Sequence, residues 1–130
     1  MEILSVLAAA AVAFALGAVW YMVLAEPWMN AAKVPRDENG QPIGQSPKLF
    51  ALSFVLTLVV AGMMRHVFTL AGIDELAKGI VAGAGVGLFF ISPWIGINNL
   101  YAMRPVRLTL IDGGYATLAC AAMGLVLTIL

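Results

Sequence analysis

An all-α integral membrane bundle of four transmembrane helices is the architecture that three features of the amino-acid sequence favour. Of the 130 residues, 62% are hydrophobic and only 11% are charged, whereas an ordinary soluble domain is about 45–50% apolar and about 25% charged. A soluble domain of this size cannot bury so much apolar surface. The apolar residues form four stretches, each as long as the ~20 residues that a helix needs to cross a bilayer. None of the four shows the strict alternation of a barrel strand.

The first predicted helix covers about residues 3–24, and its only polar side chains before Tyr21 are Ser5 and the indole of Trp20. A cleaved signal peptide is the alternative, because Val23-Leu24-Ala25 resembles a small-residue cleavage site. However, no basic segment precedes it, and the apolar stretch is longer than the roughly 7–15 residues of a signal peptide. We therefore expect a retained helix.

The other three predicted helices cover about residues 49–70, 76–101 and 108–130. Residues 26–48 contain four prolines and are expected to form a loop outside the membrane. The other two connections are short, so successive helices are expected to be antiparallel neighbours. We expect the four helices to form a single domain over residues 1–130.

The basic residues are distributed unequally between the predicted loops. The first and third loops carry five of the seven, whereas the second loop and the termini carry only Arg65 and Lys78. Cytoplasmic loops of membrane proteins are usually richer in Lys and Arg. We therefore expect the first and third loops in the cytoplasm and both termini outside.

Small residues repeat every four positions on three of the predicted helices. The repeats are Gly79, Gly83 and Gly87 on the third helix, Ala9, Ala13 and Gly17 on the first, and Ala116, Cys120 and Gly124 on the fourth. Small residues let helix backbones approach closely in lipid, although alanine and glycine are also common in membrane helices in general. The repeats predict tight helix packing, and their spacing leaves open whether the helices belong to one chain or to two copies.

The aromatic side chains with polar groups gather at one end of the predicted bundle: Trp20, Tyr21, Trp28, Trp94, Tyr101 and Tyr115. Aromatic belts usually occur at both membrane surfaces, so this one-sided distribution singles out that end. The residues that we expect to form a polar site there are Asp112, Arg104, Asn98, Asn99, Tyr115 and Glu26.

Asp112 is the central candidate, because an ionisable side chain inside a span is costly and is often functional. The alternative is a purely anchoring role, since a carboxylate near a helix N-terminus and about one turn past Arg107 is stabilised without any function. Arg104, which precedes Pro105, is either part of a turn at the membrane edge or a cation for a lipid phosphate or for Asp112.

Several function classes are disfavoured by the sequence. A net charge of zero argues against nucleic-acid binding, which depends on neutralising phosphates. One Cys and one His at opposite ends predict no metal site, and no motif indicates a cofactor. We therefore expect no enzyme. An acid–base pair of Glu26 and Asp112 acting on a lipid or a quinone is the least favoured hypothesis.

Several segments resemble one family. They are Gly17–Tyr21, Pro27-Trp28-Met29, Gly87–Tyr101, Arg104-Pro105 and the Asp-Gly-Gly-Tyr run 112–115. Together they resemble the small bacterial membrane proteins known as domain of unknown function 1761. The resemblance implies four transmembrane helices in a bacterial inner membrane and supplies no activity, substrate or cofactor. The chain departs from the family in its first connection, where Glu26-Pro27-Trp28 stands in a region that often holds Gly-Lys-Trp.

Two functional hypotheses follow from these observations. The first is a structural or interaction protein of the lipid bilayer that acts by helix–helix association, as a homo-oligomer or as an accessory subunit of a larger membrane complex. The second is a small oligomeric transporter or channel with a polar site near Asp112.

Overall fold

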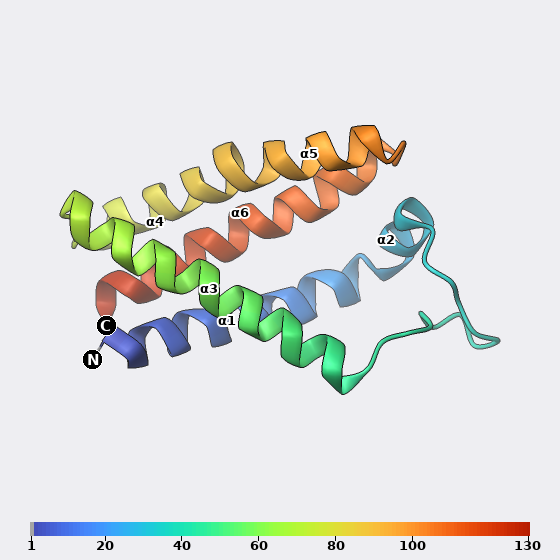
Figure 1. Cartoon of the computed structure of the whole chain (residues 1–130), viewed down its shortest axis with the longest axis horizontal. Helices are drawn as coiled ribbons and strands as arrows, with labels where there is room; N and C mark the ends of the chain where they lie inside the picture. The colour runs from blue at the N-terminus through green and yellow to red at the C-terminus, as the bar shows by residue number, and fades with distance from the viewer. Residues whose placement is uncertain (1) are drawn as a thin grey trace.

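The computed structural model describes residues 2–130 and contains four helices that are long and apolar enough to cross a membrane. They are α1 (Glu2–Val23), α3 (Pro47–Ala71), the continuous run of α4 (Leu76–Gly85), η1 (Val86–Ile91) and α5 (Ser92–Tyr101), and α6 (Val106–Ile129). No strand occurs within residues 2–130, so the all-α prediction is confirmed. Both termini lie at one end of the bundle, and the connection after α1 lies at the other (Figure 1).

The first connection contains a short helix, α2 (Ala25–Ala32), where the sequence analysis expected only a loop. Proline lacks a backbone N–H, and its ring collides with the carbonyl group four residues earlier. Pro27 is therefore incompatible with a regular helix through Val23, where α1 ends. The chain bends at Leu24 and continues as α2, which buries Met29 and Ala31.

The start and the end of α3 are set by local chemistry. The Ser46 hydroxyl accepts a hydrogen bond from the backbone N–H of Leu49 at 3.3 Å, and Pro47 occupies the first turn, where no N–H partner is needed. The helix ends at Gly72, whose φ of 70° is a left-handed conformation that glycine adopts without strain. These signals place the start of α3 two residues before the expected position.

The third membrane helix widens before Pro93. Residues 86–91 form a π-helix, η1, which accommodates the proline without breaking the helix. The Ser92 hydroxyl lies 2.7 Å from the carbonyl oxygen of Gly87 and 3.0 Å from that of Gly113. This side chain therefore connects the widened turn to α6.

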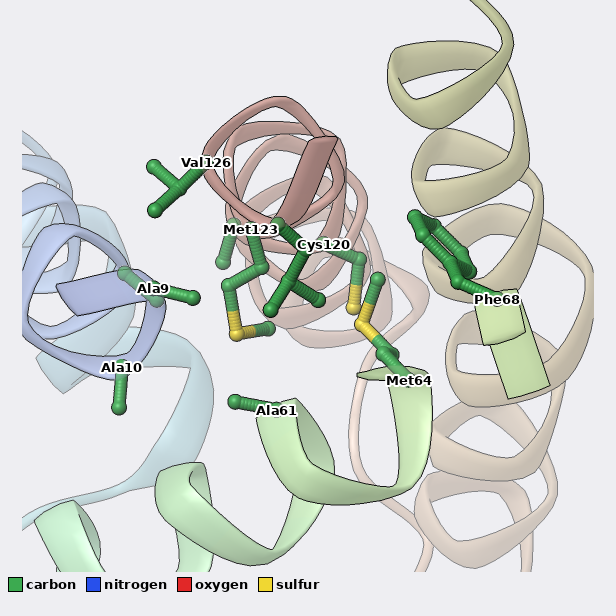
Figure 2. Packing of buried hydrophobic residues seen from close by; sticks show 11 residues of the cluster. Ala9, Ala10, Ala61, Met64, Phe68, Cys120, Met123 and Val126 are labelled. Atoms are coloured by element: carbon green, nitrogen blue, oxygen red, sulfur yellow. The ribbon is translucent and has the colours of Figure 1, made fainter. Parts of the chain in front are cut away.

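The central helix of the molecule is α6, which packs against α1, α4, η1 and α5. Half of its most apolar stretch is buried (50%), compared with 11% for α3. In Figure 1, α6 runs beside α4 and α5, and α3 crosses α1 obliquely. Figure 2 shows small and flexible side chains filling the core between three helices, with Ala9 and Ala10 from α1, Ala61 and Met64 from α3, and Met123 from α6.

The glycines of α4 and η1 lie directly against the backbone of α6. A Cβ atom on Gly83 would collide with the backbone of Cys120, and one on Gly87 would lie 2.5 Å from the carbonyl oxygen of Ala116. Gly79 and Gly124 face each other in the same way. The backbones touch because α4 and η1 present glycines and α6 presents the small residues Ala116, Cys120 and Gly124, and this contact forms within one chain.

Candidate functional site

Four consecutive residues, Asp112 to Tyr115, connect α6 to two neighbouring elements, α1 and α5. Asp112 accepts a hydrogen bond of 2.6 Å from the hydroxyl of Tyr21 on α1. Tyr115, one turn later, donates a hydrogen bond of 2.6 Å to the carbonyl oxygen of Ala13, also on α1. Hydrogen bonds between helices stabilise bundles in lipid, where no water competes for the partners.

The two glycines between Asp112 and Tyr115 make room for bulky neighbours. A Cβ atom on Gly113 would lie 2.8 Å from the Ser92 hydroxyl oxygen, and one on Gly114 would lie 2.9 Å from the Trp20 ring. The Trp20 indole N–H, in turn, donates to the carbonyl oxygen of Ile111 at 3.0 Å. Asp-Gly-Gly-Tyr is therefore a packing sequence in which each residue meets a different partner.

The ring of Tyr21 is held by two other aromatic rings. Its centroid lies 5.7 Å from that of Trp28 and 5.5 Å from that of Tyr115, both in edge-on arrangements. Such pairs are favourable because the positive edge of one ring meets the negative face of another. The packing holds the Tyr21 hydroxyl in position for its hydrogen bond to Asp112.

A groove with a volume of about 1150 Å³ opens beside this cluster. Its walls come from α1 and α2 on one side and from the N-terminal half of α3 on the other, and α6 contributes further lining. Most of the lining is apolar and includes Phe14, Phe50, Leu56, Val60 and Met123. The polar or charged groups at one end of the groove include Tyr21, Asp112, Tyr115 and Glu26. A large apolar cavity with a few converging polar groups is the usual form of a small-molecule site.

The charges in the groove are all negative. Glu26 and Asp112 line it, and no Lys, Arg or His among residues 2–130 does so. Glu26 pairs with Arg36 at 3.0 Å, and Arg36 also donates to the side chain of Asn30 at 2.7 Å. Asp112 forms no ion pair in the described part of the chain, where its hydrogen-bond partner is Tyr21. Asp112 therefore lacks a compensating cation.

The other residues expected in the polar site lie outside the groove. Arg104 donates a hydrogen bond of 2.6 Å to the carbonyl oxygen of Ala32, the last residue of α2. Asn99 donates to the Thr109 hydroxyl at 3.0 Å, and Asn98 is exposed. The expected ion pair of Asp112 with Arg104 or Arg107 does not form among residues 2–130. Arg104 instead bonds to a carbonyl oxygen at the C-terminus of α2, where carbonyl groups have no partner within the helix and attract a cation.

Tyr21 and the walls on α3 are the site residues that the sequence analysis missed. Tyr21 was placed at the correct end of the bundle, but its pairing with Asp112 joins residues that are 91 positions apart. Phe50 and Leu56 look like ordinary lipid-facing residues in the sequence. Their position in the groove depends on the angle at which α3 crosses α1, for which the sequence carries no signal.

Comparisons with known proteins extend over nearly the whole chain but supply no activity. The family model described as "Protein of unknown function (DUF1761)" matches residues 4–128. No curated protein and no solved structure gives a significant match. The matched region includes all the helices that form the groove, and any function has to be argued from their geometry.

Proposed function

Because the chain belongs to the DUF1761 family of proteins of unknown function and has four helices able to cross a membrane, we propose that it is a membrane-embedded binding protein. Its ligand is an amphipathic small molecule that enters the groove from the lipid bilayer. The single observation that carries the proposal is the groove itself, which has apolar walls and the Tyr21–Asp112 pair at one end.

The shape of the groove suits a molecule with one long apolar part and one polar end. An apolar chain would lie along Leu56, Val60 and Met123, while a polar group would meet Tyr21 and Asp112. Burying apolar surface is favourable, and the polar groups fix the orientation. The proposal requires no reaction on the ligand. A transporter made of several copies would use the same site.

The proposal includes a location and an orientation. We propose the bacterial inner membrane, with the first and third loops in the cytoplasm, because these loops carry five of the seven Lys and Arg residues. Alkaline phosphatase fused to the C-terminus should be active, since that enzyme requires the periplasm. An active fusion in the loop after α2 and an inactive one at the C-terminus would reverse the orientation.

Saturable labelling by a photoreactive lipid tests the binding function. The probe is a fatty alcohol with a diazirine in its chain, added to proteoliposomes and mapped by mass spectrometry. We expect saturable labelling of groove residues, such as Leu56 and Val60. Ala18→Phe, whose new ring projects into the groove, should remove that labelling.

The matched control is Ala15→Phe, because Ala15 lies on the same helix, is also exposed and does not line the groove. This variant should be labelled like the wild type. Labelling that never saturates and that spreads evenly over outward residues, such as Val59 and Phe90, in all three proteins would contradict the proposal.

Association of helices between copies is the second candidate function. Two mid-span glycines, Gly62 on α3 and Gly85 on α4, have open space where a Cβ atom would stand, so no neighbouring helix within residues 2–130 packs closely on them. Chemical crosslinking in membranes should give a discrete oligomer that is lost in the Gly62→Leu and Gly85→Leu double variant. A protein that stays monomeric in the membrane would contradict this role.

A further inference from the structure

The charges around the groove indicate the chemical class of its ligand. We propose that the groove binds a lipophilic cation, an amine or a quaternary ammonium with a long apolar part, and that Asp112 is its counter-charge. This inference rests on the proposed binding function and specifies the substrate class of the same site.

The first step of the argument is the uncompensated carboxyl group. Glu26 already has the guanidinium group of Arg36 at 3.0 Å, so its charge is balanced by the protein. Among residues 2–130, the side-chain partner of Asp112 is the Tyr21 hydroxyl alone, and one neutral hydrogen bond does not balance a charge. A carboxylate in apolar surroundings is costly without a cation. A cationic head group in the groove would supply that missing partner.

The second step is a cluster of three aromatic rings. Tyr21, whose hydroxyl bonds to Asp112, lines the groove together with Trp28 and Tyr115, and both of these rings pack edge-on against the Tyr21 ring. The faces of Trp and Tyr rings attract cations within about 6 Å of the ring centroid. Aromatic rings together with a carboxylate form a typical environment for an ammonium group.

The third step excludes the other classes of head group. An anionic head group would meet the carboxyl group of Asp112 and no Lys, Arg or His in the groove as described by residues 2–130. A neutral head group would leave Asp112 without a counter-charge. The second cavity, at the other end of the bundle, differs in this respect, because Arg65 and His66 line it together with Glu2. The preference for cations is therefore specific to the groove.

A matched series of probes tests the inference. Three photoreactive lipids share one diazirine-bearing chain and differ only in the head group, which is trimethylammonium, hydroxyl or carboxylate. We expect the ammonium probe to label the groove with about tenfold higher apparent affinity than the alcohol, and the carboxylate probe to label it least. In Asp112→Asn the ammonium probe should lose its advantage over the alcohol probe.

Asp112→Asn is a conservative change, because the amide oxygen can still accept the hydrogen bond from Tyr21. Glu2→Gln, which removes a carboxylate at the opposite end of the molecule, serves as the control and should label like the wild type. Equal saturable labelling by the ammonium and the alcohol probes would overturn the cation preference and leave the binding function intact. The absence of saturable groove labelling by all three probes would overturn the binding function itself.

Discussion

The side chain of Tyr115 contributes to the packing of α6 on α1 through both its hydroxyl and its ring. It donates a hydrogen bond of 2.6 Å to the carbonyl oxygen of Ala13, and its ring lies over Gly17, where a Cβ atom would be only 2.8 Å from that hydroxyl. Gly17 is therefore small because Tyr115 occupies its side-chain space. The same tyrosine also packs against Tyr21 and thus supports the hydrogen bond to Asp112.

Removing this hydroxyl should weaken the fold by a measurable amount. In Tyr115→Phe the bond to Ala13 is lost while the ring remains, and interhelical hydrogen bonds in membranes contribute about 0.6 kcal/mol on average and up to about 1.7 kcal/mol. We expect a decrease of about 1 kcal/mol in the free energy of unfolding, measured by SDS titration in mixed micelles. Tyr101→Phe is the control, because Tyr101 is 88% exposed. An equal change in both variants would contradict the role of the bond.

Asp112 shows that residues close in the sequence do not identify the hydrogen-bond partner of a polar side chain. Its position and its unusual polarity within a span were evident from the sequence, and Arg107 was the nearest cation. The structure instead gives Asp112 the Tyr21 hydroxyl, because α1 lies against α6 at this level. Sequence proximity indicates partners only on the same helix, whereas the observed partner comes from another one.

At the level of elements, α4 lies close to α6 because α4 has glycines, which carry no side chain, where the two helices meet. Gly83 touches the backbone of Cys120, whereas Gly85, two residues later in the same helix, faces open space. The repeat glycines Gly79, Gly83 and Gly87 all contact α6, whereas Gly85, which is not part of the repeat, does not. The repeat predicted close packing, and the structure identifies α6 as the helix that α4 packs against.

Adding one methyl group to Gly83 or to Gly85 should distinguish the glycine that contacts α6 from the glycine that faces open space. In Gly83→Ala the new methyl group collides with rigid backbone, and overpacking of this kind costs about 1–3 kcal/mol. In Gly85→Ala the methyl group meets nothing, and alanine is a better helix former than glycine by about 1 kcal/mol. We expect the free energy of unfolding to fall in the first variant and to stay equal or rise in the second. Similar losses in both would contradict the packing of α4 on α6.

At the level of the whole molecule, the two halves of α3 are buried to different degrees, although Phe54 in the N-terminal half packs edge-on against Phe14 of α1. Its buried residues are Ala61, Met64 and Phe68, all in the C-terminal half. The N-terminal half forms a wall of the groove and buries no residue. We infer from this distribution that the N-terminal half of α3 moves more relative to α6 than the C-terminal half does.

Distances between spin labels should reveal this difference. One label at position 118 on α6 is paired with a second on α3, either at position 52 or at position 63, where the native Leu52 and Met63 are 54% and 60% exposed. We expect a broader distance distribution, by electron–electron double resonance, for the pair that contains position 52. Segments with few buried contacts move with larger amplitude. Distributions of equal width would contradict a mobile wall.

Local properties of the sequence were enough to predict the membrane-spanning character, the four long helices, the all-α fold and the family, because hydrophobicity, helix length and short motifs are properties of contiguous residues. The short helix α2 and the π-helix η1 were missed. Both occur near prolines, whose effect on the chain direction depends on what the next residues pack against.

The groove, the Tyr21–Asp112 pair and the chain-internal use of the glycines came from the three-dimensional arrangement alone. Each depends on the angle at which two helices cross and on which of their faces meet, and the residues of the Tyr21–Asp112 pair are 91 positions apart. Four apolar helices of these lengths are compatible with many crossing angles in lipid, where the hydrophobic effect does not drive the helices together. Small residues and a few hydrogen bonds therefore select one arrangement among them.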